Sequence, residues 1–273
     1  MAVESRGAST GRSGGKHSPR GVVEEVADHP VTEAGVRAGY AVNGLLHLLI
    51  AWLGLQVAFG RSGTEADPSG AMAVVAASPV GMVVLIAVVV AFALLAIWQL
   101  GEAVRGPETG DRVKAIAKAL TYLALAWLAV SILMGSGGSG RQQAKDTTAA
   151  LMDLPFGGAL VVVLGLVVVG VGAYHIYKGW TEKFRSDLTS TPPALVVNAG
   201  KVGYIAKGIA LIAVGAGLVV AGVRNRPSES RGLDGALHDI AQLPMGQALL
   251  TLIALGFAAY GFYSFSRAQR ART

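Results

Sequence analysis

The chain has 273 residues, of which 52% are hydrophobic and 15% charged, with a formal net charge of +6 and no cysteine. Soluble domains carry roughly 25% charged residues, so this composition argues against an ordinary soluble globule. The lack of cysteine excludes disulfides, thiolate metal sites and cysteine nucleophiles. Residues 1–35 are polar and rich in Gly and Ser, which predicts a disordered tail and no cleavable signal peptide.

Six long apolar runs follow the tail. Each holds about 20 residues, which is the length of helix that crosses the hydrocarbon core of a bilayer. Several are apolar on every side, whereas the helices of a soluble bundle keep a polar stripe. The pattern predicts an all-α, polytopic membrane protein with six transmembrane helices. The runs are residues 40–59, 80–100, 113–134, 156–177, 202–223 and 245–265.

The basic residues predict which way the chain faces. Of the 23 Lys and Arg, 17 fall in the two tails and in the segments between spans 2 and 3 and between spans 4 and 5. Positive flanks stay cytoplasmic, so we expect a multi-pass protein of the cell membrane with both termini in the cytoplasm. These flanks suit the lipid bilayer and its anionic inner-leaflet lipids as partners, and they suit nucleic acid poorly.

The chain repeats one unit three times. Each unit consists of an outgoing helix, an outer loop and a returning helix. The motif x-Pro-x-Gly stands at the start of the returning helix, and its second and third copies follow at offsets of 76 and 89 residues. Gly44, Ala119 and Gly208 align in the outgoing helices at offsets of 75 and 89, so the two registers agree within one residue. This predicts three parallel two-helix repeats with pseudo-threefold symmetry about the membrane normal. Their bounds are 36–106, 107–185 and 186–268, followed by a basic tail at 269–273.

Each unit contains an outer loop that ends in a short, partly apolar stretch. These stretches predict short interfacial helices, with Asp67, Asp146 and Asp234 as their caps. Proline is expected to open each returning helix, where its missing N–H is not needed.

The Gly-Tyr-like openings and the x-Pro-x-Gly returns resemble the domain of unknown function 1206 family. The resemblance covers about residues 36–268 and implies a bacterial integral membrane protein. The second unit departs from the opening pattern, with Ala115 where the others have tyrosine. The family brings no established activity, so the resemblance implies no catalytic residues.

Polar side chains within the spans gather toward the cytoplasmic ends. One interpretation is a polar vestibule on the pseudo-axis that holds water, an ion or an anionic headgroup. The alternative is that these side chains snorkel and belong to the aromatic belt. The candidate residues are Asn43, His47, Lys118, Lys207, Gln99, His175, Glu102, Lys178 and Arg267.

His47 lies about two turns deep and is the hardest of these residues to explain by snorkelling. It could relay protons or line a pathway, or it could hydrogen-bond to a neighbouring helix. His175 lies at a different depth, so a haem between the two histidines is not expected, and no other cofactor or metal site is indicated. The Gly-rich stretch 135–140 formally fits G-x-G-x-x-G but has no preceding strand, which favours a linker.

Three hypotheses about function follow. The first is a structural or interaction protein of the membrane with no enzymatic activity, for which a second copy of the chain, in a homo-oligomer, is one candidate partner. The second is a small-solute or ion channel or transporter with a cytoplasm-facing vestibule. The third is a membrane enzyme or redox subunit, which the lack of catalytic motifs disfavours.

Overall fold

The computed structural model describes residues 30–61, 63–106, 108–137, 139–188 and 192–270. Within these ranges it contains nine α-helices and no β-strand, and six of the helices are long and apolar enough to cross a membrane. The six expected spans are thereby confirmed as helices. The six are α2 (Pro30–Ala58), α4 (Pro79–Arg105), α5 (Thr109–Leu133), α7 (Gly157–Trp180), α8 (Ala194–Arg224) and α10 (Gly246–Arg270). Most of the predicted tail lies outside the described residues, although α2 already begins within it.

Each unit also contains a short helix between its two long ones, as expected. These helices are α3 (Pro68–Ala76), α6 (Gly140–Met152) and α9 (Gly232–Ala241). The predicted caps are right only for Asp67, whose carboxylate accepts a hydrogen bond from the Gly70 N–H at 2.9 Å. Asp146 lies inside α6, which Ser139 caps instead. Asp234 lies in the first turn of α9 and bonds to another unit.

The x-Pro-x-Gly motif makes two different structures. In the first unit Pro79 is the first residue of α4, as predicted. In the other two units the helix begins later, at Gly157 and Gly246, because Phe156 and Met245 are left-handed with φ 61°. There the proline and the left-handed residue form a turn closed by the Gly N–H, which suits proline at its second position.

The long helices pair across unit boundaries more extensively than within units. The closest pairs are α4 with α5, α7 with α8, and α10 with α2. Only a short connection joins α4 to α5, which favours antiparallel neighbours. A 3₁₀ turn, η1 (Lys183–Asp187), lies between α7 and α8. The α2–α10 pair joins the first unit to the last and brings the start of α2 and the end of α10 to one side, named here the terminal face. The opposite side, which carries α3, α6 and α9, is the loop face.

Small residues set the crossing point in each pair. Added to Gly172, a Cβ would lie 2.7 Å from the Gly208 carbonyl oxygen, and added to Gly44 it would lie 2.9 Å from that of Gly261. In α4 and α5 the equivalent residues, by the same repeat offsets, are Ala96 and Ala119, each 1% exposed. Backbones can therefore approach closely, which is how helices gain packing energy where apolar burial against lipid offers little.

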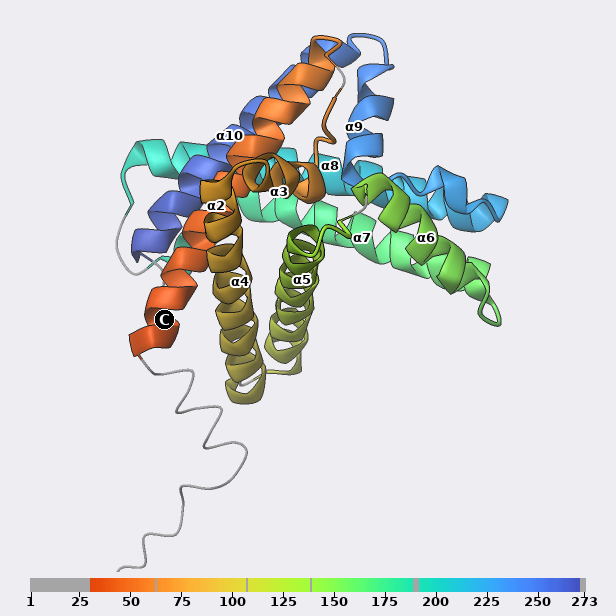
Figure 1. The fold of residues 1–273 in the computed structure, drawn as a ribbon. Coiled ribbons are helices and arrows are strands. Elements are labelled where there is room, and N and C mark those ends of the chain that lie inside the picture. The colour runs from red at the N-terminus through yellow and green to blue at the C-terminus, as the bar shows by residue number, and fades with distance from the viewer. Residues whose placement is uncertain (1–29, 62, 107, 138, 189–191, 271–273) are drawn as a thin grey trace, which may run out of the picture.

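The three pairs do not close into a ring. Helix α2 also packs against α4, and α8 against α10, whereas no comparable packing joins α5 and α7. Figure 1 shows the pairs inclined to one another, with α4 and α5 pointing downward and α7 and α8 running across the view. The expected pseudo-threefold symmetry is therefore not confirmed, although the pairing follows the repeat.

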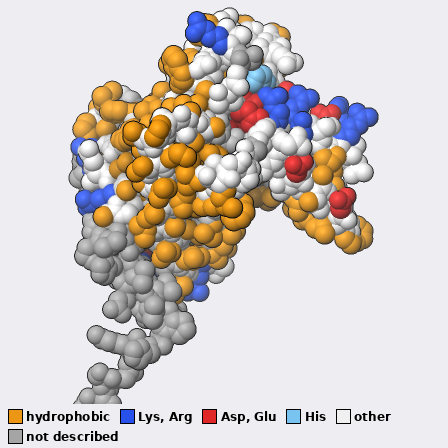
Figure 2. All heavy atoms as spheres, viewed as in Figure 1, with side chains coloured by type: hydrophobic (Ala, Val, Ile, Leu, Met, Phe, Trp, Pro, Cys, Tyr) orange, Lys and Arg blue, Asp and Glu red, His pale blue; other side chains and the backbone are white. Residues whose placement is uncertain are grey.

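A broad apolar surface covers the long helices (Figure 2). It includes large side chains such as Trp52, Trp127 and Trp180, which are 59%, 67% and 71% exposed. Contiguous apolar surface of this extent is foreign to water-soluble monomers and fits contact with lipid. The chain is thus an all-α protein whose long helices suit a multi-pass membrane location.

A polar network joins all three units at the loop face. Asp234 of unit three accepts a hydrogen bond from the Ala66 N–H of unit one at 2.8 Å and forms an ion pair with Arg141 of unit two. The three units therefore meet at this carboxylate. Gly140 donates to the Ser69 hydroxyl at 3.0 Å. In Figure 2 acidic, basic and histidine side chains gather in the region where Figure 1 places α6 and α9. The network fixes the short helices against one another.

The carboxyl of Asp67 gives stability an unusual pH dependence. Burial raises the pKa of this carboxyl, neighbouring Glu65 and Asp234 raise it further, and bonds from Ser69 and Gly70 oppose the rise. The pKa of Asp67 is therefore higher in the folded protein than in the unfolded chain. Its contribution to the free energy of unfolding is fully present below about pH 3.8, and it is lost as the pH rises through the pKa of the folded state. We expect Asp67→Asn, which can still cap α3, to melt at a higher temperature than wild type at pH 7.

The measurement is the difference in melting temperature between the variant and wild type from pH 3.5 to 8. The difference should shrink toward zero at the acid end. Asp67→Ala serves as the control, since it also loses the cap and should cost about 1 kcal/mol at neutral pH. A constant difference between Asp67→Asn and wild type across the range would contradict the assignment.

Candidate functional site

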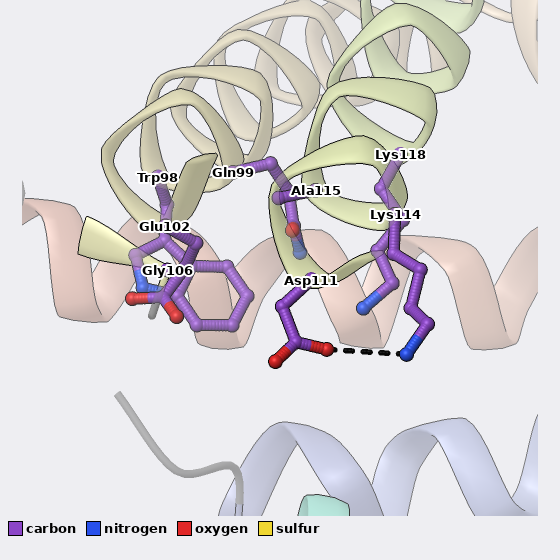
Figure 3. A pocket seen from close by; sticks show the side chains of 8 residues that line it. All are labelled: Trp98, Gln99, Glu102, Gly106, Asp111, Lys114, Ala115 and Lys118. Atoms are coloured by element: carbon purple, nitrogen blue, oxygen red, sulfur yellow. Dashed lines mark hydrogen bonds and ion pairs between the residues drawn. The ribbon is translucent and has the colours of Figure 1, made fainter. Parts of the chain in front are cut away.

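A pocket opens at the terminal face between α4 and α5 (Figure 3). Its volume is about 260 Å³. Trp98 and Glu102 come from α4, while Asp111 and Lys114, which are joined by an ion pair of 3.1 Å, come from α5. Three of the predicted vestibule residues line it, namely Gln99, Glu102 and Lys118.

Trp98 links this pocket to a cation in the middle of the terminal face. Its ring lies edge-on to that of Tyr40, with centroids 6.4 Å apart. On Tyr40 sits the guanidinium of Arg267, 4.3 Å from the ring centroid. Such cation–π contacts stabilise a charge that has lost much of its water. Helices α4, α2 and α10 thereby hold Arg267 beside the pocket.

One carboxylate accepts both central cations. Asp187, at the end of η1, lies 2.7 Å from Lys178 Nζ and 3.5 Å from a terminal nitrogen of Arg267. Burial alone would raise the pKa of Asp187, but the guanidinium of Arg267 and the ammonium of Lys178 outweigh it and hold the pKa below its usual range. Lys118 lies within electrostatic reach of all three groups. Two cations thus share one carboxylate, with a third nearby.

An aromatic cluster forms the floor under these charges. Tyr204 contacts Phe184, Tyr260 and Tyr263 with ring centroids 5.2 to 5.6 Å away. Lys178 lies 5.2 Å from the centroid of Tyr204, and Lys207 lies 4.5 Å from that of Tyr260. The cluster orients the lysines and limits the access of water to them.

The deeper candidate residues contact their own helices and neighbouring side chains. His47 Nδ1 lies 2.8 Å from the Asn43 carbonyl oxygen of its own helix, and its ring is 4.6 Å from that of Tyr260. The expected bond to a neighbouring helix is therefore wrong. Asn43 reaches across to Ser264 at 3.5 Å. His175 likewise contacts a carbonyl of its own helix, that of Val171, at 2.8 Å.

The structure thus brings most, but not all, of the predicted residues together. Lys178 and Arg267 meet on Asp187, while Glu102, their counterpart by repeat position, pairs with Arg105 at 3.2 Å. Asp187, the carboxylate on which Lys178 and Arg267 converge, was not among the predicted residues. Its signal was weak, because it is one of two acids in a basic segment between spans 4 and 5.

The cluster retains capacity for a further polar partner. The Tyr40 hydroxyl and Arg267 Nε are buried and have no hydrogen-bond partner. Leaving such groups unpaired costs free energy, so a ligand that accepts from them gains affinity. An anion with several oxygens matches these donors and the excess of positive charge. The described residues contain no group of three or more His, Asp or Glu side chains arranged for a metal ion.

Comparisons with known proteins agree with the repeat. The family described as Domain of Unknown Function (DUF1206) matches three successive segments, residues 38–106, 113–182 and 202–271. The chain is 27% identical over 244 residues to a Bacillus subtilis (strain 168) protein described as uncharacterized protein YxxB, covering 85% of this chain and 88% of that one. No solved structure matches the chain. With three tandem matches across most of its length, the chain belongs to the DUF1206 family, whose activity is unknown.

Proposed function

We propose that this chain is an interaction protein of the cytoplasmic membrane that binds the phosphate of an anionic lipid headgroup at its terminal face. The observation that carries the proposal is the convergence of Lys178 and Arg267 on the single carboxylate of Asp187, with Lys118 within electrostatic reach of them. Phosphate oxygens would supply the missing negative charge and accept from the unpaired donors. The proposal assigns binding, and no enzymatic step.

The distribution of basic residues supports both the cytoplasmic placement of the terminal face and an anionic lipid as its partner. The tails and terminal-face connections hold 17 of the 23 Lys and Arg, so we place this face and both termini in the cytoplasm. The inner leaflet carries the anionic lipids of a cell membrane, and each nearby basic residue attracts them by about 1 kcal/mol.

The test compares phosphatidylglycerol with phosphatidylcholine bound to the purified protein by native mass spectrometry. We expect wild type to retain phosphatidylglycerol preferentially, and Lys178→Gln to reduce that preference about fivefold, the equivalent of about 1 kcal/mol. Lys178→Arg keeps the charge and should restore it. Lys145→Gln removes one charge from α6 at the loop face and is the matched control.

Two results would overturn this proposal. One is equal retention of the two lipids by wild type. The other is a loss in Lys145→Gln as large as that in Lys178→Gln, because the preference would then reflect net charge alone. Melting temperatures of all variants establish that each is folded.

The second candidate is a channel or transporter, and one observation favours it. A second pocket of about 420 Å³, lined in part by Glu65, Ser69 and Ser139, opens at the loop-face end of α5. A solute passing between the pockets would cross a packed region where Phe92 stacks on Tyr122 at 5.9 Å. Ion flux through sealed vesicles that changes in a Lys118→Ala/Lys207→Ala variant would favour transport over binding.

A further inference from the structure

One buried side-chain amide lines the pocket between α4 and α5. Gln99 of α4 is 2% exposed, and its side chain extends between the two helices (Figure 3). Within the part of the chain that the structure describes, this amide makes no hydrogen bond. A buried amide without a partner costs free energy, so a polar group that enters the pocket and bonds to it gains affinity.

The equivalent residues of the other two units already have partners. His175 and Ser264 follow Gln99 at the repeat offsets of 76 and 89 residues. His175 Nδ1 lies 2.8 Å from the Val171 carbonyl oxygen, and the Ser264 hydroxyl accepts from the Asn43 amide at 3.5 Å. Of this set of three, Gln99 is therefore the residue whose polar atoms remain for a ligand.

The carboxylates of the pocket argue against a cationic ligand. Glu102 pairs with Arg105 at 3.2 Å, and Asp111 pairs with Lys114 at 3.1 Å. Each carboxylate thus has a cation beside it, so an ammonium headgroup would have to compete with a side chain of the protein. The remaining lone pairs of the carboxylates can still accept hydrogen bonds from an uncharged donor.

Lys118 supplies a positive charge at the same pocket. It lines the pocket from α5, and no carboxylate among the described residues lies within ion-pair distance of it. It is also within electrostatic reach of Asp187 and Arg267. A phosphate that binds Lys118 would therefore adjoin both the charged cluster and the amide of Gln99.

The amide lies at a depth that a headgroup can reach. Helix α4 has 27 residues and is about 40 Å long, close to the thickness of a bilayer with its headgroups. Gln99 stands six residues before the last residue of this helix, Arg105, which is a distance of about 9 Å. It therefore lies near the inner border of the headgroup region, on the side of the terminal face.

Hydroxyl groups match the amide best. A hydroxyl both donates and accepts, and so does the amide of Gln99, whose oxygen can accept from one hydroxyl while its nitrogen donates to the next. The volume of about 260 Å³ far exceeds the roughly 10–15 Å³ that one water needs, so a group of several heavy atoms fits.

We infer that this pocket binds the glycerol of a glycerol phosphodiester, as in the headgroup of phosphatidylglycerol. The phosphate lies on Lys118, and the hydroxyls bond to Gln99 and to the carboxylates of Glu102 and Asp111. The inference rests on the proposed function and adds which anionic headgroup the site selects.

The test compares phosphatidylglycerol with phosphatidylethanol of the same acyl chains, bound to the full chain and measured by native mass spectrometry. Phosphatidylethanol carries the same phosphodiester charge but ends in an ethyl group without hydroxyls. We expect wild type to retain phosphatidylglycerol about fivefold more, as one additional hydrogen bond provides. This comparison needs no variant, so it does not depend on how a substitution folds.

A pair of variants assigns the preference to the pocket. Gln99→Met keeps the length of the side chain and removes its polar atoms, so the ratio of the two lipids should fall to about one. Gln143→Met makes the same change at an exposed position of α6 on the loop face and should keep the wild-type ratio. Lys178→Gln should lower retention of both lipids, because both carry the phosphate.

Four outcomes would contradict these assignments. Equal retention of the two lipids by wild type, with both above phosphatidylcholine, would reject the glycerol site and leave the proposed function intact. A preference that survives in Gln99→Met would also reject it, because the hydroxyls would then bind elsewhere. Displacement of phosphatidylglycerol by an equal concentration of soluble sn-glycero-3-phosphoglycerol would overturn the lipid as the source of the group. Retention of phosphatidylcholine equal to that of both anionic lipids would reject the proposed function itself.

Discussion

Replacing Gly172 by leucine is expected to destabilise the protein by about 3 kcal/mol or more, since overpacking at a tight site costs this much. A Cβ there would lie 2.7 Å from the Gly208 carbonyl oxygen and 3.0 Å from the Ile212 backbone nitrogen. Backbone atoms cannot rotate away as side chains do, so α7 and α8 would have to separate. These two helices make the most extensive contact among the long helices. The measurement is thermal unfolding in detergent, followed by circular dichroism.

Gly170→Leu is the matched control on the same helix. Nothing lies within 4 Å of a Cβ at Gly170, and the residue is exposed. Leucine favours helix over glycine by up to about 1 kcal/mol, so this variant should be as stable as wild type or more so. Similar losses of stability in the two variants would show that α7 and α8 do not cross at Gly172.

Removing the carboxylate of Asp234 is expected to cost about 3 kcal/mol, the lower end for one partner of a buried ion pair. Its side chain is 1% exposed, whereas that of Arg141 is 35% exposed. In Asp234→Ala the Ala66 N–H loses its acceptor, while Arg141 regains some solvation, which keeps the loss from being larger. Because Asp234 joins the three units, we expect limited proteolysis to cut near α6 and α9 at lower protease concentrations.

Asp239→Ala is the control for this experiment. Asp239 lies on the same helix and pairs with Arg231 at 3.0 Å, but its side chain is 57% exposed. Exposed ion pairs contribute at most about 1 kcal/mol, so proteolysis and melting should change little. If Asp234→Ala behaves like Asp239→Ala, the loop-face network does not hold the units together.

Much of the fold could be predicted from the sequence because its signals are local. Apolar length fixes a span, and the repeated x-Pro-x-Gly fixes the unit, so six helices in three repeats follow without tertiary information. Helix ends were less predictable. Phe156 and Met245 adopt left-handed conformations, which their side chains do not favour, and they delay the start of α7 and α10.

The site could be predicted only in part. Repeat positions identified Lys118, Lys178, Lys207 and Arg267, since charged residues within spans stand out. They could not identify Asp187 as the shared partner, because its contact with Arg267 depends on how η1 is placed relative to α10. Glu102 and Arg267 occupy the same repeat position and were both candidates for the vestibule, but the structure gives them different partners.

The sequence by itself thus determined the number of helices, their repeat and the side on which basic residues collect, because each depends on composition and spacing along the chain. Only the tertiary structure decided which helices pair, that α5 and α7 are not packed together, and that Lys178 and Arg267 meet one carboxylate. These depend on contacts between residues far apart in sequence, such as Gly172 with Gly208 across α7 and α8, and Arg267 with Asp187.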